Sequence, residues 1–244
     1  MADIVKQATA YILAPLKEPD WASVTQGDPF APLIAHAGDI PETVRESLET
    51  EGILERYKHE GEELLGCYHG MSSPGRITLF RDTLRSLFWG IISRLSRAGY
   101  QFWKEDLEAL AQLTALKTWK HEQFHLFVDI QEHLAPGHGT AGRLMEEAMA
   151  CAHSWQQLQL TSPAKRILPS LRRPFLALAF DYGNMPGYAD WPQFSSEIAF
   201  QGGLLELFHR QGLFQLEANG VPVGRLLLEQ LNIMDSVQTV NVLA

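Results

Sequence analysis

The feature that most constrains the fold is a long helical pattern between about residues 105 and 134. Its apolar side chains recur at near-helical spacing, which gathers them on one side of an α-helix. They are Leu107, Leu110, Leu113, Leu116, Phe124 and Phe127. Pro136 and Gly137 end the pattern, because proline cannot continue a helix and glycine commonly follows its last turn. A helix this long needs other elements around it, so the segment predicts a largely helical domain.

The sequence His-Glu-Gln-Phe-His lies near the end of this helix, at residues 121–125. Residues four apart lie over one another on a helix, so His121 and His125 present both imidazoles on one face, at a separation that fits two ligands of one Zn²⁺. Glu122 is rotated by about 100° from His121, which puts its carboxylate beside the metal position, where a general base belongs. The residues around the motif include a run of uncharged side chains, as expected of a helix buried around a metal: Thr118, Trp119, Gln123, Phe124, Leu126 and Phe127.

This segment resembles the active-site helix of the zincin metallopeptidases, which carry the same motif with uncharged flanks and use its glutamate as the base. Metzincins would continue with a glycine and a third histidine, but Val128 and Gln131 stand at those positions. The resemblance is therefore to gluzincins, whose third ligand is a glutamate from a second helix some twenty or more residues downstream. It covers roughly residues 64–155.

The segment LMEEAMACAHSW offers two candidates for that third ligand, Glu146 and Glu147, which point about 100° apart on a helix. Glu147 lies 22 residues after His125 and is favoured, because the residues on its face are small enough for two helices to approach closely. Those residues are Ala150, Cys151 and Ser154. Glu146 remains the alternative. Asp129, one turn beyond His125, either orients a ligand histidine or lies on the helix surface.

The resemblance implies a Zn²⁺ ion held by His121, His125 and Glu147 with a coordination position left open. Such an ion would activate water and polarise a substrate carbonyl, with Glu122 accepting the proton. Zincins often draw a further donor for the oxyanion from a later Tyr or His. The candidates are Tyr182 and Tyr188, with His153 and His209 behind them. Zincins also bind an extended substrate along a strand before the active-site helix, a role that falls here to residues 76–80.

The predicted fold class is α+β: a mostly helical zincin-like domain over residues 63–244, with a small antiparallel sheet before the active-site helix. The two strands come from ELLGCYHGMSSPGRITLF, and the glutamate helix spans about residues 140–160. Residues 1–62 are expected to be an appendage packed on this core. It would contain a helix over residues 3–18, a loop packed by Trp21 and Phe30, and a charged helix from Pro41 to about Gly61.

The other elements are predicted from caps and turn residues. Asp82 is placed to cap a helix through about Ala98. Helical turns continue to Phe180, and a further helix follows from about Pro192 to His209. Asn219-Gly220 is typical of a type I′ hairpin turn, with strand–turn–helix as the alternative.

The net charge and the hydrophobic pattern limit the kinds of partner that the protein is expected to bind. The formal net charge of −9 argues against a surface that grips nucleic acid, and no stretch approaches the length of a membrane span. The expectation is a cytoplasmic zinc metallopeptidase acting on a peptide or protein substrate, with reduced packing cysteines at Cys67 and Cys151 and no indication of oligomeric state. Two alternatives stay open: a catalytically silent zincin-like module that binds a protein partner, and a helical protein in which the motif is accidental.

Overall fold

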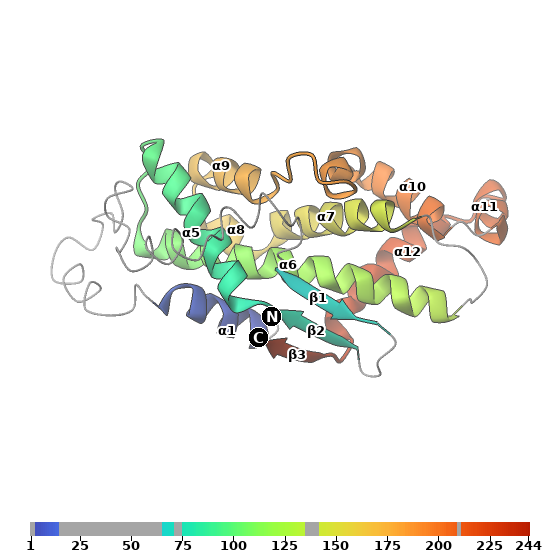
Figure 1. Cartoon of the computed structure of the whole chain (residues 1–244). Coiled ribbons are helices and arrows are strands. Elements are labelled where there is room, and N and C mark those ends of the chain that lie inside the picture. Colours follow the sequence, from blue (N-terminus) through green and yellow to red (C-terminus); the bar gives the residue numbers. More distant parts are fainter. Residues whose placement is uncertain (1–2, 15–64, 71–74, 135–141, 209–210) are drawn as a thin grey trace.

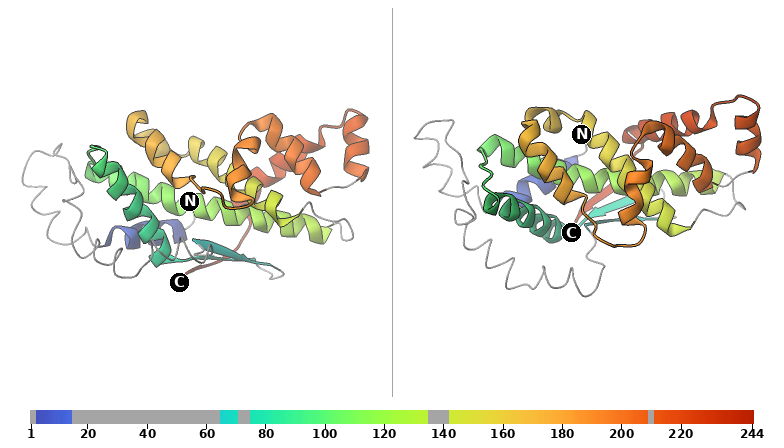
Figure 2. Two further views of the ribbon diagram at one scale, coloured as in Figure 1. Left: turned by 45° about the horizontal axis from the view of Figure 1, so that its top comes forward. Right: turned by 90° about the horizontal axis from the view of Figure 1, so that it is seen from above.

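A computed structural model of the chain describes residues 3–14, 65–70, 75–134, 142–208 and 211–244, and its core is organised around one central helix (Figure 1). Helix α6 (Lys104–Leu134) has the sheet and α1 (Asp3–Ile12) on one side and α7 (Arg143–Leu160) on the other. Seen from above, α7 lies across α6 (Figure 2). The fold class is α+β and mostly helical, as predicted, and the long helix lies where the periodicity indicated.

Helix α6 is covered on nearly all sides, and residues 113–120 are all buried. A helix in this position must also satisfy its buried polar side chains. The Lys120 ammonium donates a hydrogen bond of 2.7 Å to Asp235 Oδ1, and the Gln123 amide donates one of 3.0 Å to the same oxygen. Asp235 belongs to the short helix η4 (Ile233–Ser236), so this polar contact joins the end of the chain to its centre.

The sheet has three strands in the order β1 (Gly66–His69), β2 (Arg76–Leu79) and β3 (Val240–Leu243). Strands β1 and β2 form the predicted antiparallel pair, with Cys67 opposite Thr78. Strand β3 was not predicted, and it pairs in parallel with β2. Because β2 is the central strand, its backbone is paired on both sides. The expectation that residues 76–80 would bind an extended substrate is therefore wrong, and the strand that lies against the candidate site is β1.

Helix α5 (Arg81–Arg97) begins two residues earlier than a helix capped by Asp82 would. Its N-cap residue is Phe80, whose backbone is extended, because the chain passes directly from β2 into the helix. The prediction that Asp82 caps this helix is wrong. Asp82 lies in the first turn, where a negative charge is still favoured by the helix dipole, and it accepts a hydrogen bond from the Tyr11 hydroxyl of α1.

Asn219 and Gly220 end a helix instead of forming a hairpin. The hairpin is therefore wrong, whereas the alternative of strand–turn–helix is right about the turn and the helix after it and wrong about the segment before it, which is helical. Gly220 has a φ of 83°, and the Val221 N–H donates a hydrogen bond of 3.0 Å to the Leu216 carbonyl five residues earlier. This is the glycine-terminated helix end that leaves a tight turn before the next helix. The elements from α7 to the end of the chain are α8 (Ser162–Arg166), α9 (Pro169–Ala179), η3 (Tyr188–Phe194), α10 (Glu197–Phe208), α11 (Gln211–Ala218), α12 (Val223–Asn232), η4 and β3.

Among the described residues, two hydrophobic clusters form the core, and α6 takes part in both. The first cluster joins α1, β2, α5 and α9 to α6 as far as Trp119. The second cluster joins α7, α10 and α12 to α6 from Phe124 onwards. Helix α7 also spans both, since Met149 belongs to the second cluster and Leu158 to the first. The His-Glu-Gln-Phe-His motif therefore lies where the two clusters meet.

The N-terminal helix α1 packs on this core through its apolar face, and the Trp89 indole donates a hydrogen bond of 3.1 Å to the Ile12 carbonyl. The remaining part of the predicted appendage, with Trp21, Phe30 and the helix from Pro41, lies outside the described residues. Within the described segments, no helix has both the length and the apolar character that crossing a bilayer requires.

Candidate metal centre

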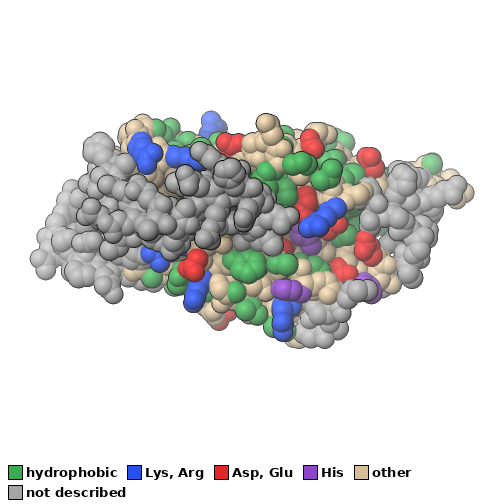
Figure 3. Space-filling view, in the orientation of Figure 1, with side chains coloured by type: hydrophobic (Ala, Val, Ile, Leu, Met, Phe, Trp, Pro, Cys, Tyr) green, Lys and Arg blue, Asp and Glu red, His purple; other side chains and the backbone are tan. Residues whose placement is uncertain are grey.

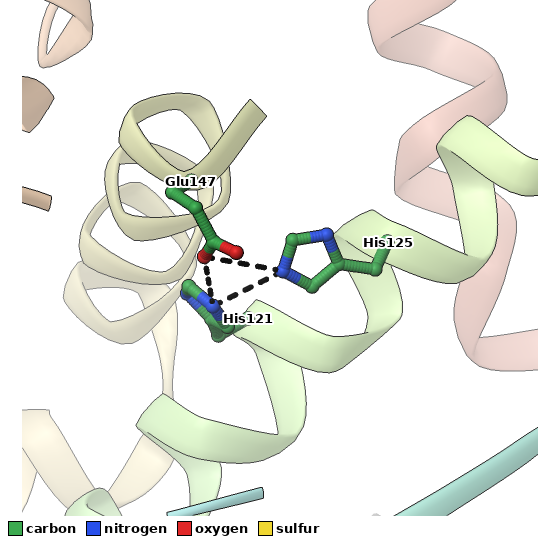
Figure 4. Close-up of side chains that lie close together, drawn as sticks. All are labelled: His121, His125 and Glu147. Carbon is green, nitrogen blue, oxygen red and sulfur yellow. Dashed lines mark hydrogen bonds and ion pairs between the residues drawn. The ribbon is translucent and has the colours of Figure 1, made fainter. Parts of the chain in front are cut away.

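Three ligand-type side chains converge between α6 and α7: His121 and His125 from α6 and Glu147 from α7 (Figure 4). His121 Nε2 lies 3.2 Å from His125 Nε2. Glu147 Oε2 lies 3.2 Å from His121 Nε2 and 3.5 Å from His125 Nε2. Three donor atoms this close can share one cation, and the residues could therefore hold a metal ion.

The two candidate glutamates take different positions. Glu147 faces both histidine Nε2 atoms, whereas Glu146 Oε1 lies 2.6 Å from Nδ1 on the far side of the His125 ring. Glu146 therefore holds the orientation of His125. Asp129, which was expected to do this or to lie on the surface, accepts a hydrogen bond from the Tyr68 hydroxyl and lies 3.2 Å from His133 Nδ1.

Within the cluster, the carboxylates of Glu146 and Glu147 favour a positive charge on His125. Burial lowers the pKa of His125, but the hydrogen bond with Glu146 and the nearby carboxylate of Glu147 outweigh it and raise the pKa to about 9. Burial would raise the pKa of Glu147, yet the nearby rings of His121 and His125 hold it well below its usual range. Without a metal ion, protons on the imidazoles balance the carboxylate charge.

The surroundings of Glu147 support a metal site independently of the His-Glu-Gln-Phe-His motif. Glu147 Oε2 is buried and, among the described residues, accepts no hydrogen bond, although it faces two ring nitrogens. A buried carboxylate oxygen left in this state is costly unless a cation or a proton donor meets it. Two imidazoles and one carboxylate form the ligand type that Zn²⁺ takes in open, catalytic sites.

Glu122 lies beside the triad and against strand β1. Its side chain is 5% exposed and has a backbone hydrogen bond with Tyr68. Burial raises the pKa of Glu122, while the charges of His121 and His125 oppose the rise. A Cβ atom at Gly66 would lie 3.0 Å from Glu122 Oε1, so glycine at this position lets β1 approach the glutamate closely.

Tyr182 and Tyr188 both line the pocket over the triad. The Tyr188 ring stacks on the His121 ring, with centroids 5.8 Å apart and planes 12° apart. Burial, followed by the charge of Glu147, raises the pKa of Tyr188, and burial with the neighbouring Cys151 raises the pKa of Tyr182. Both hydroxyls therefore keep their protons, with Glu147 as a hydrogen-bond partner of Tyr188 and Cys151 as a partner of Tyr182. The Tyr182 ring lies 5.3 Å from that of Tyr188.

The pocket has a volume of about 700 Å³ and is bounded by β1, α6, α7 and the segment from Tyr182 to Tyr188. Acidic and histidine side chains gather on the part of the surface that α6 and α7 occupy (Figure 3). Sequence reasoning missed one lining residue of clear chemical interest, Lys117, one turn before His121. The sequence around it, LKTWK, holds a second lysine at Lys120 and does not single Lys117 out.

Of the two histidines considered as further donors, His153 does not extend the site. His153 is buried in the second cluster, with its ring 6.0 Å from that of Phe124 and 6.2 Å from that of Phe200. Burial lowers the pKa of His153 to about 3, so the ring is neutral at physiological pH. His209 lies outside the described residues. Both cysteines are free, and Cys151 Sγ lies 3.6 Å from His121 Nδ1.

Comparison with models of known protein families, with curated proteins and with solved structures finds no match to this chain. The likeness to zincins therefore rests on the chain's own residues. The structure supports this likeness through one feature, the cluster of His121, His125 and Glu147, which could bind a metal.

Proposed function

We propose that this protein is a zinc-dependent metallopeptidase of gluzincin type that hydrolyses a peptide bond in a peptide or protein substrate. The observation that carries the proposal is the convergence of His121 Nε2, His125 Nε2 and Glu147 Oε2 on one point in the wall of an open pocket. Glu122, the residue that a zincin needs beside its metal, lines the same pocket.

His121, His125 and Glu147 would hold the ion, and Glu146 would fix the ring of His125 from behind. When bound, Zn²⁺ supplies Lewis-acid activation of water and of a carbonyl group. Two neutral imidazoles and one carboxylate leave the site with net positive charge, which favours a substrate oxygen as an additional ligand.

Glu122 is suited to the role of general base. Burial raises the pKa of its carboxyl group toward neutrality, and a carboxylate with a raised pKa accepts a proton more readily than an exposed one. The backbone contact with Tyr68 holds the carboxylate beside the triad. Glu122 would take a proton from water and return it to the leaving amine.

Substrate binding would use the edge of the sheet and the tyrosines. Gly66, Cys67 and Tyr68 of β1 line the pocket, and an edge strand can add an extended peptide through backbone hydrogen bonds. Tyr188, whose ring stacks on His121, is the better placed donor for the oxyanion, and Tyr182 lies behind it.

The proposal is tested by substituting Glu122→Gln in the full chain. This variant should bind zinc in the same one-to-one ratio as the wild type, measured by metal analysis after dialysis. Its cleavage of a quenched fluorescent peptide library should fall by at least about a hundredfold, because the base is lost and the ligands are kept. Glu108→Gln, an exposed position on the same helix, is the matched control and should cleave normally.

Two outcomes would contradict the proposal. A chain that retains no stoichiometric zinc would show that the motif is accidental. A chain that binds zinc but leaves every library peptide intact, in wild type and variant alike, would favour the alternative of a catalytically silent module that binds a protein partner.

A further inference from the structure

Lys117 is a buried cation whose charge the described residues do not neutralise. Its side chain is 4% exposed, and in the described part of the chain no carboxylate lies within ion-pair distance of its ammonium group. Lys117 Nζ lies instead 5.2 Å from the centre of the Phe180 ring and 4.9 Å from that of the Tyr182 ring. Aromatic faces attract a cation without neutralising it.

The position of this ammonium group links it to the candidate centre. Lys117 lines the pocket together with His121 and Tyr182. It stands one helical turn before His121, which is about 6 Å along the helix axis. Burial lowers the pKa of Lys117 to about 8, and the neighbouring Cys151 opposes the shift, so the amine still carries a proton at pH 7.

Other charged groups around the pocket make Lys117 distinctive. The other charged side chains of the pocket wall are mainly acidic, with Glu147 in the triad and Glu122 and Glu146 beside it. The other cation of the described lining is Arg143, whose side chain is 89% exposed and lies 3.9 Å from Glu147 Oε1. A buried, unpaired ammonium in a pocket is costly to maintain and becomes favourable when an anionic ligand completes it.

We propose that Lys117 is a specificity-determining residue that binds a carboxylate group of the substrate. This inference rests on the proposed peptidase function and deepens it. An extended peptide advances about 3.3 Å per residue, so a carboxylate held at Lys117 belongs within about two residues of the scissile bond. That carboxylate is either an acidic side chain or the C-terminal carboxylate of a short peptide.

The test compares three tripeptides of the same size by isothermal titration calorimetry. The first is acetyl-Ala-Glu-Ala-amide, with a side-chain carboxylate; the second is acetyl-Ala-Gln-Ala with a free C-terminus; the third, acetyl-Ala-Gln-Ala-amide, has neither. Titrations use the full chain carrying Glu122→Gln, so that no peptide is cleaved. One acidic peptide should bind at least about tenfold more tightly than the neutral one, and which of them does so identifies the source of the carboxylate.

Variants at position 117 assign the preference to this ammonium group. Lys117→Met keeps the apolar contact with the aromatic rings and should abolish the preference, whereas Lys117→Arg keeps the charge and should retain it. Lys165→Met removes an exposed lysine elsewhere and should change nothing. Thermal melting followed by circular dichroism confirms that each variant is folded.

The inference is overturned if the three peptides bind equally, if none binds, or if the acid preference survives in Lys117→Met. These results are separable from a failure of the peptidase proposal, because binding is measured without hydrolysis. Cleavage without acid preference overturns the role of Lys117 alone, and acid preference without cleavage overturns the peptidase alone.

Discussion

The residues of the candidate centre differ in how far the sequence predicts them. The positions of His121, Glu122 and His125 follow from the helical period, because a spacing of four fixes a common face whatever surrounds the helix. The choice between Glu146 and Glu147 depends on how α7 is rotated about its axis. That rotation is set by packing with residues far along the chain. Lys117 could not be singled out, because a lysine on a helix is ordinarily solvated.

Because Glu146 and Glu147 take different positions, removing each side chain should weaken metal binding to a different degree. Glu147→Ala removes a ligand and should weaken zinc binding by more than about a hundredfold, whereas Glu146→Ala loosens the His125 ring and should weaken it by about ten- to a hundredfold. Competition with a chromophoric chelator measures both, with exposed Glu206→Ala as the control. The opposite order would mean that Glu146 is the ligand.

The buried His153 predicts acid sensitivity of the fold. In the unfolded chain its pKa lies near 6.5, whereas burial lowers it to about 3 in the folded protein. Between these values the unfolded state binds a proton that the folded state does not, so the free energy of unfolding falls as the pH drops below 6.5. This one group should account for about 2 kcal/mol between pH 7 and pH 5.

Replacing His153→Phe should remove that part of the pH dependence, because phenylalanine fits between two aromatic neighbours and does not titrate. Urea unfolding at pH 7 and at pH 5 measures the difference between wild type and variant. An unchanged difference would show that His153 keeps its ordinary pKa in the folded protein.

At the level of elements, helices with strong local signals were predicted and pairings between distant segments were not. Helix α6 has apolar residues at near-helical spacing and is followed by Pro136 and Gly137, and both α6 and α7 lie near their predicted bounds. Strand β3 is four residues long, and only its partner β2, more than 150 residues earlier, makes it a strand. The Asn219-Gly220 pair could not be assigned from the sequence for a related reason. A glycine with a positive φ is found at the end of a helix as well as in a hairpin turn.

Because β1 lies so close to α6, a side chain at position 66 should destabilise the protein. A Cβ atom there would lie 2.6 Å from Thr118 Cγ2 and 3.0 Å from Glu122 Oε1. Gly66→Ala should therefore lower the free energy of unfolding by about 1–3 kcal/mol, through the shift that such overpacking forces. Urea denaturation measures this change.

Gly90→Ala is the matched control for this substitution. A Cβ at Gly90, in the middle of α5, has no neighbour within 4 Å, and alanine there should stabilise the protein by about 0.5–1 kcal/mol. If Gly66→Ala were as harmless as Gly90→Ala, the contact between β1 and the candidate centre would be looser than the structure has it.

For the whole molecule, the sequence predicted a mostly helical domain with an N-terminal appendage packed on it, but it did not predict that the core of the described residues would divide into two clusters. Each cluster draws on segments from distant parts of the chain, as with α1 and α9 in the first. The candidate centre lies at their junction because α6 and α7 run through both. Hydrophobic periodicity reports which side of a helix is buried and not which partner buries it.

Because α6 and α7 run through both clusters, the two clusters should unfold together. Calorimetry should record one heat-absorption peak whose measured enthalpy equals the van't Hoff enthalpy. Phe175→Ala in the first cluster and Phe200→Ala in the second should each lower that same melting temperature, since either truncation costs about 3–5 kcal/mol. Two separate peaks, each moved by one substitution, would contradict this. In the described part of the chain, no half joined along such a spine can melt alone, and the candidate metal centre and the resistance to heat would be lost in a single event.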